Sequence, residues 1–159
     1  MKRVSKLGLA AVCSLAAISV VSAQRGPQTP EQKAQMAVKV RQSLFEVQSY
    51  SFGPAAAMLR PGSNFDPKVA ETAAKRVEMT SSMIPDVFKF DTRKFTVTTK
   101  ARDDIWMNMS DFAQKAQALN MAAQNLAMVA MSGDRSATVR AIGMVGKACG
   151  NCHDQFRNK

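Results

Sequence analysis

The sequence predicts an all-α protein folded as an antiparallel four-helix bundle. Four segments between residues 29 and 159 repeat apolar residues at intervals of three and four, and each is bounded by residues that start or stop helices. No two segments alternate apolar and polar residues as paired strands would. The chain has 159 residues, 46% of them hydrophobic and 21% charged, which suits one globular domain. Mostly short connections favour antiparallel neighbours.

Residues 1–23 are typical of an export signal. Three basic residues precede an uncharged apolar run over residues 7–21, and Ala23 ends a group of small residues suited to cleavage. The run is shorter than the ~20 residues that a membrane-spanning helix needs. Cys13 follows Val12 rather than the small residue of a lipoprotein signal. We therefore expect cleavage after Ala23, a periplasmic location, no membrane span and a mature domain over residues 24–159.

The first helix is predicted to begin at Pro30. Thr29 is a capping residue, Pro30 suits the first helical position, and Gln32 completes a capping box. Gly53-Pro54 predicts a kink and Pro61-Gly62 the end of the segment. Its apolar residues at helical spacing are Met36, Val40, Leu44 and Val47.

The second helix is predicted to follow the start signal Asp66-Pro67 and to stop by Pro85. Its apolar stripe includes Val69, Ala73 and Val77. Residues 86–100 alternate aromatic or β-branched residues with polar ones, but no other segment offers a pairing partner. We interpret them as a surface loop, with a short strand as the alternative.

The third and fourth helices are predicted from the remaining periodic segments. Asp103 and Asp104 place negative charge at the start of the third, and Gly133-Asp134 ends it. The fourth begins near Arg135. One of its faces carries Ile142, Val145, Cys149, Cys152 and Phe156.

The charge balance is basic. Removal of residues 1–23 takes away three of the 22 basic residues and none of the 12 acidic ones, which leaves an excess of seven positive charges. The basic residues are scattered rather than clustered with aromatic residues, and the chain is expected outside the cytoplasm, so we expect no nucleic-acid partner. A solvated surface and a docking surface for an acidic protein are both consistent with this charge.

One motif near the end of the chain carries chemistry. Cys149-Gly150-Asn151-Cys152-His153 is a C-x-x-C-H sequence, the attachment signature of a c-type haem. Cysteines three apart on a helix project from one face, so both sulfurs can reach the vinyl groups of one porphyrin. His153 then presents its imidazole to the iron. The sequence therefore predicts one covalent haem c in the bundle.

Three alternatives were weighed for these residues. A zinc site needs four ligands, and the mature chain has two cysteines and one histidine. A thioredoxin-like pair normally lies in an alternating strand and helix pattern, which is absent here. A plain disulfide leaves His153 and the export signal unexplained. Gly143, Gly146 and Gly150 also favour haem, because their lack of a side chain would let a flat macrocycle approach the helix.

The chain resembles the class II c-type cytochromes, of which cytochrome c prime is the best-known type. The resemblance covers most of the mature chain and includes a C-x-x-C-H motif close to the carboxyl terminus. The matching segments are residues 38–43, Phe52-Gly53, Phe65-Asp66, Ile105-Trp106, Val145-Gly146 and residues 149–157. It implies a four-helix bundle, often dimeric, so a homodimer is possible here. The loop over residues 86–100 departs from the type.

The resemblance also implies roles for single residues. Arg41 matches an arginine near a haem propionate, and Phe45 matches the side chain over the open face of the iron. A Met at that position is the sixth ligand in the low-spin branch of the family, whereas an apolar non-ligand leaves the iron five-coordinate, as in cytochrome c prime. Phe45 therefore implies five-coordinate iron. Arg41, Phe45, Gln48 and Phe52 also lie along one stripe of the helix.

Three further residues are implied on the haem pocket. Arg157, one turn after His153, matches a basic residue beside the proximal ligand, and Phe156 matches its aromatic neighbour. Trp106 matches an aromatic residue near the haem.

Three functions follow as hypotheses. The first is a five-coordinate haem protein without enzymatic turnover, which binds nitric oxide or carbon monoxide and exchanges electrons with periplasmic redox proteins, its distal face offering no hydrogen-bond donor. The second is a six-coordinate shuttle that uses another Met as ligand. The third is a peroxidase, disfavoured because the mature chain has no second His. Candidate Met ligands are Met36, Met58, Met107 and Met121.

Overall fold

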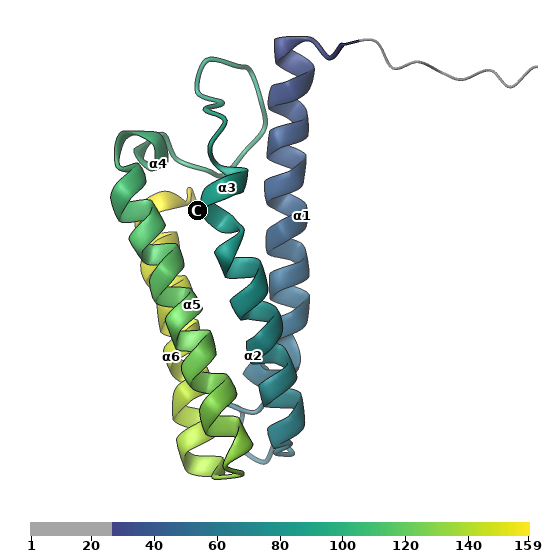
Figure 1. Ribbon diagram of the computed structural model, residues 1–159, viewed down its shortest axis with the longest axis vertical. Coiled ribbons are helices and arrows are strands. Elements are labelled where there is room, and N and C mark those ends of the chain that lie inside the picture. The colour runs from purple at the N-terminus through teal and green to yellow at the C-terminus, as the bar shows by residue number, and fades with distance from the viewer. Residues whose placement is uncertain (1–26) are drawn as a thin grey trace, which may run out of the picture.

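The protein is a bundle of four long helices with two short ones between them (Figure 1). A computed structural model describes residues 27–159, and the predicted export signal with Cys13 lies outside the described residues. The long helices are α1 (Pro30–Ala57), α2 (Pro67–Ser82), α5 (Met109–Met131) and α6 (Arg135–Phe156), and the short ones are α3 (Ile84–Val87) and α4 (Asp104–Met107). The predicted all-α antiparallel four-helix bundle is confirmed.

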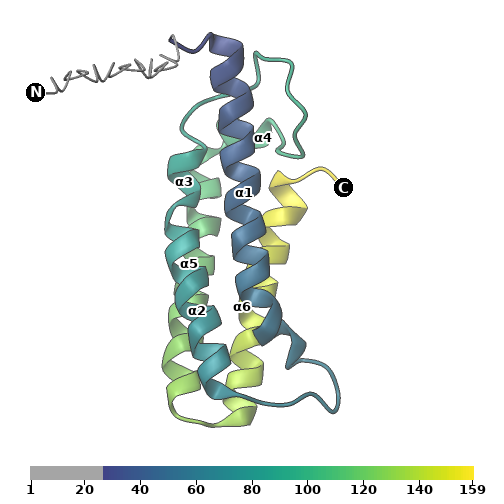
Figure 2. The same ribbon diagram turned by 90° about the vertical axis from the view of Figure 1, so that its right-hand side faces the viewer.

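The helices pack in a chain of neighbours. α1 packs against α2, α2 against α5, and α5 against α6, whereas α1 and α6 touch at few points (Figure 2). The core is apolar and contains a row of aromatic rings, with Phe88 and Phe112 centred 4.8 Å apart and Phe112 and Phe156 5.3 Å apart. No helix within residues 27–159 has the length and hydropathy to cross a membrane.

The predicted helix starts are confirmed. Thr29 and Gln32 form both hydrogen bonds of a capping box. Asp66 accepts a hydrogen bond from the backbone N–H of Lys68 at 2.8 Å, and Asp134 accepts one from Ala137 at 3.0 Å. Each capping side chain bonds to a backbone N–H group only two or three positions along the chain, so the cap can be recognised from the local sequence.

The predicted apolar face of the first helix is wrong. Of the four residues expected in the core, only Leu44 is buried, and Met36, Val40 and Val47 are 45%, 45% and 54% exposed. The buried face instead contains three polar residues, Arg41, Gln48 and Ser51 (the full set is Ala34, Val38, Arg41, Leu44, Gln48, Ser51 and Ala55). A pattern of apolar residues cannot locate a face that buries hydrogen-bonded polar side chains.

Several boundaries differ from the prediction. α1 continues through Pro54 and ends at Ala57. After Ser82 the chain re-enters a helical turn that contains Pro85 near its first position, where a proline needs no hydrogen-bond donor. The predicted third helix is split at Asn108, whose backbone angles of φ −131° and ψ 46° separate α4 from α5.

Residues 88–100 form the predicted loop and contain no strand. The loop is nevertheless anchored in the core, because Phe88 and Thr92 are only 3% and 2% exposed. Its end pairs with the end of α6 through one antiparallel bridge between Ala101 and Arg157. The backbone N–H of Arg102 donates to Phe156 O at 3.0 Å, which ties the loop to the helix that carries the C-x-x-C-H motif.

Candidate haem site

The last turns of α6 place the motif on the wall of a cavity. Cys149, Cys152 and His153 all line a cavity of about 560 Å³ inside the bundle. The opposite part of the lining comes from α1, which contributes Phe45 and Phe52 among others. The cavity therefore lies between α1 and α6, which make few contacts with each other.

The residues of this cavity fit a covalently bound haem. Its volume is within the range of cofactor sites, about 300–1,000 Å³, and most of its lining is apolar. Both cysteines and His153 project from the same face of α6, as thioether attachment and axial ligation require. Gly146 lies in the wall one turn before Cys149, and a Cβ there would meet no atom within 4 Å, so the helix surface leaves room for a flat group. Gly143 and Gly150 do not line the cavity.

Burial controls the charge of these groups. Burial raises the pKa of both thiols, and that of Cys152 reaches about 11 because Cys149 adds to the effect. Burial, and then the charge of Arg157, lowers the pKa of His153, with Asp154 opposing both. The neutral imidazole is the form that binds iron, so the surroundings of His153 favour the ligating state. Within residues 27–159 no group of three His, Cys, Asp or Glu side chains is arranged to hold a metal ion, so the zinc alternative lacks a ligand set there.

Arg41 lines the cavity and also fastens the loop. Its guanidinium donates to Val87 O at 2.8 Å and to Thr92 Oγ1 at 3.0 Å, and it also donates to Phe90 O. It lies 4.6 Å from the centre of the Phe88 ring. Burial lowers the pKa of Arg41, and the charge of Asp91 partly offsets this. Three of its five N–H donors are used on the loop, and its contact with a propionate stays a prediction.

The predicted stripe of α1 faces the cavity as a unit. Arg41, Phe45, Gln48 and Phe52 all contribute to the lining. The Phe45 ring is centred 6.3 Å from that of Phe88, so the core holds it in place. The polar member, Gln48, is 8% exposed.

Of the other predicted pocket residues, some line the cavity and one does not. Phe156 and Arg157 line the cavity, whereas Trp106 does not. The indole N–H of Trp106 donates to Phe88 O at 3.0 Å, so this residue holds the start of the loop. The resemblance matches Trp106 to an aromatic residue near the haem, and that role stays a prediction.

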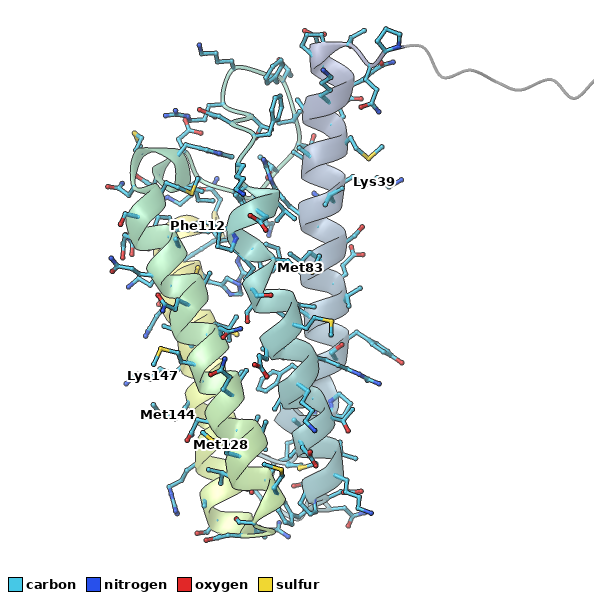
Figure 3. The ribbon with its side chains drawn as sticks, in the orientation of Figure 1. Lys39, Met83, Phe112, Met128, Met144 and Lys147 are labelled. Atoms are coloured by element: carbon cyan, nitrogen blue, oxygen red, sulfur yellow. The ribbon has the colours of Figure 1, made fainter. Side chains whose placement is uncertain are left out.

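Sequence reasoning missed two basic residues of the lining, Lys100 from the loop and Lys115 from α5. It did not assign the buried Phe88 and Phe112 to the haem pocket, although both line the same cavity. Figure 3 shows Phe112 within the upper part of the bundle. Lys115 follows Phe112 by three positions, and this interruption of the apolar stripe was the available signal. No sequence pattern around Lys100 predicts its place on the cavity, because that place is set by the bridge between the neighbouring Ala101 and Arg157.

Known proteins match this chain along most of its length. The profile of the family described as Cytochrome C' matches residues 36–157. Cytochrome c' of Rubrivivax gelatinosus is 32% identical over 128 residues, which cover 80% of this chain and 98% of the relative. Cytochrome c' of Halomonas halodenitrificans is 30% identical over 125 residues, with 76% and 95% covered.

Solved structures agree in fold. Cytochrome c prime from Shewanella frigidimarina superposes with a TM-score of 0.72 at 31% identity, over 79% of this chain and 97% of that one. A nitric oxide complex of a cytochrome c prime variant from Alcaligenes xylosoxidans gives 0.70 at 26% identity, over 83% and 99%. This chain therefore belongs to the Cytochrome C' family and is a c-type cytochrome built as a four-helix bundle with one covalent haem c.

Proposed function

We propose that this chain is a periplasmic haem protein in which His153 is the only protein ligand of the iron. In this proposal Cys149 and Cys152 form the thioethers, and nitric oxide or carbon monoxide binds on the face of the haem turned toward Phe45. Haem iron, when bound, supplies the ligand-binding and electron-exchange chemistry. The export signal over residues 1–23 supports the location.

The lining of the cavity carries the argument for a five-coordinate iron. Within the part of the chain that the structure describes, no methionine lines the cavity, and His153 is its only imidazole. Met36, Met107 and Met121 are 45%, 60% and 61% exposed on the outside of the bundle. Met58 is buried but lies outside the lining. A six-coordinate His/Met site would require one of these residues to move into the cavity.

The remaining residues of the site have supporting roles in this proposal. Arg41 and Arg157 contribute positive charge to the cavity, which suits the propionates of a haem. Phe45 blocks coordination from α1 because its side chain has no donor atom for iron. The nitric oxide complex of the Alcaligenes relative supports gas binding here. Periplasmic redox proteins are the proposed electron partners, and we propose no enzymatic turnover.

Optical and electron-spin spectra of the holoprotein, with and without carbon monoxide, test this function. We expect a high-spin ferrous iron that takes up carbon monoxide readily. A low-spin spectrum that resists carbon monoxide would contradict the proposal and favour the His/Met shuttle. Rapid turnover of peroxide would favour a peroxidase instead.

We also propose that two copies of the chain associate through the outer face of α1. Met36, Val40, Val47 and Tyr50 fall along one stripe of this helix, and Tyr50 is 82% exposed. Exposed apolar stripes of this kind are typical of protein interfaces.

A further inference from the structure

Gln48 is a buried polar side chain on an otherwise largely apolar wall. It lies on α1 one turn after Phe45 and one turn before Phe52, and all three line the cavity. Only 8% of its surface is exposed. A buried amide normally has hydrogen-bond partners for both of its ends, so the contacts of Gln48 decide what it presents to the cavity.

One end of the amide is held by α2. The Thr80 hydroxyl donates to Gln48 Oε1 at 3.0 Å. The same hydroxyl lies 2.9 Å from Arg76 O and 3.2 Å from Val77 O, within its own helix. Thr80 is itself 8% exposed, so the pair forms a fixed link between α1 and α2.

The other end of the amide has no protein partner. Among the described residues, nothing accepts a hydrogen bond from Gln48 Nε2, yet no fully enclosed polar side-chain atom lacks a partner. Nε2 is therefore not sealed in the core. Gln48 lines the cavity and is otherwise buried, which leaves the cavity as the space open to its two N–H donors.

We propose that Gln48, held by Thr80, donates a hydrogen bond to the ligand bound in the cavity and so favours ligands that carry negative charge. This inference rests on the proposed function, since it places the ligand on the α1 side of the cavity. It differs from the expectation that the distal side has no hydrogen-bond donor, and the experiments below decide between the two. An amide donor stabilises anions and strongly polarised ligands more than carbon monoxide, which is a weak acceptor.

The vibration of bound carbon monoxide reports the sign of this interaction. A donor beside the oxygen increases back-donation from iron into the antibonding orbitals of the ligand, which weakens the C–O bond. We expect the ferrous carbonyl of Gln48→Leu to have a higher C–O stretching frequency than that of the unchanged protein. If the amide were turned over, with Nε2 on Thr80 and Oε1 in the cavity, the frequency would fall instead.

Affinities supply the second readout. We expect Gln48→Leu to weaken azide binding to the ferric protein roughly tenfold, the effect of one lost hydrogen bond. Carbon monoxide affinity should change by less than about twofold, because that ligand accepts weakly. Thr80→Val keeps the shape of Thr80 and releases the amide, so it should weaken azide by a smaller factor and broaden the C–O band. Gln35→Leu, on an exposed position of α1, is the matched control.

The outcomes separate this inference from the proposed function. If the unchanged protein binds neither carbon monoxide nor azide, both are wrong. If it binds carbon monoxide but Gln48→Leu leaves the C–O frequency and the azide affinity unchanged, only the role of Gln48 is wrong. A fall in frequency also overturns the donor role. If Gln48→Leu does not retain haem, the inference is tested with Thr80→Val instead. A C–O band and an azide affinity in Thr80→Val that match those of the unchanged protein would contradict the inference.

Discussion

The side chains that face the cavity from α1 differ in what they contribute. Arg41 is bonded to the loop, Phe45 is held by the aromatic core, and Gln48 is bonded to α2. Each is fixed by a different part of the molecule. Substitutions along this one stripe should therefore have effects that can be told apart.

Phe45 offers a direct test of coordination. We expect Phe45→Met to give a low-spin iron whose uptake of carbon monoxide is slowed, because a thioether placed at this position can bind the sixth site. The optical spectrum of the ferrous holoprotein measures the change. Phe45→Leu is the control and should stay high-spin. A high-spin spectrum in both variants would show that position 45 does not face the iron.

Arg41 should matter for stability as well as for the haem. We expect Arg41→Leu to reduce the free energy of unfolding by about 3 kcal/mol, because it removes hydrogen bonds from a charged donor and leaves the carbonyl groups of the loop without partners. Denaturant unfolding of the holoprotein measures this. Amide hydrogen exchange over residues 88–97 should become faster.

The matched control for Arg41 is on the same helix. Lys39→Leu changes an exposed residue, which Figure 3 shows pointing away from the bundle, and should cost less than about 0.5 kcal/mol. An equal loss in both variants would mean that the loop contacts of Arg41 contribute nothing to stability.

At the level of elements, the starts of helices could be predicted and the buried face of α1 could not. Thr29, Asp66 and Asp134 act on N–H groups two or three residues away, so a local sequence contains the whole interaction. The face of α1 depends on Thr80 and on the loop carbonyls, which come from distant segments. The same holds for the end of the loop, which the bridge to Arg157 fixes.

In the predicted site, too, the residues fixed by local sequence could be predicted and those fixed by distant segments could not. The motif from Cys149 to His153 is local to one helix, and Cys149, Cys152 and His153 all line the cavity. Trp106 lies on α4, which the break at Asn108 separates from α5, and its place near the haem stays a prediction. Gln48 was seen on the stripe, but its hydrogen bond to α2 could not be read from the sequence.

The contribution of Asp134 to the stability of the start of α6 depends on pH. Hydrogen bonds from backbone N–H groups, that of Ala137 first, lower the pKa of Asp134. A carboxylate whose pKa is lower when folded stabilises the protein above its unfolded pKa of about 3.9, and this contribution is lost as the pH falls through the folded value.

We therefore expect Asp134→Asn, which keeps a capping side chain without the charge, to show a smaller fall in Tm between about pH 5 and pH 2 than the unchanged protein. Thermal unfolding across this range measures the difference between the two proteins. Glu46→Gln, an exposed change on α1, should follow the unchanged curve. Parallel curves for Asp134→Asn and the unchanged protein would rule out a charged cap.

For the whole molecule, the cavity makes the fold depend on its cofactor. Without haem, the mostly apolar lining of this cavity of about 560 Å³ would lose its packing partner and meet water. We therefore expect haem to stabilise the packing of α1 against α6.

We expect the double variant Cys149→Ala, Cys152→Ala, produced without covalent haem, to lose cooperative thermal unfolding and part of its helical signal in circular dichroism. The α2–α5 contact, which is the most extensive between any two helices, should retain the most protection from hydrogen exchange. A variant without haem that unfolds as cooperatively as the holoprotein would contradict this dependence. Cys149→Ala alone, which retains one thioether, is the control.

The proposed dimer concerns the outer face of α1. We expect Val47→Glu to shift the holoprotein toward the monomer in sedimentation, because a charge would enter an apolar contact. Met128→Glu is the matched control, since Met128 is 61% exposed on α5 and Figure 3 shows it on the outer side with Met144 and Lys147. Equal masses for Val47→Glu and the unchanged protein would place any interface elsewhere.

The sparse packing between α1 and α6 has a consequence for ligand kinetics. α1 packs mainly against α2 and meets α6 at few points, so a small movement of α1 alone would open a seam along α6 while the α2–α5 contact stays intact. A gas molecule would enter and escape through this breathing motion rather than through a permanent channel. Solvent viscosity, acting on the movement of a whole helix, would then set the pace of recombination.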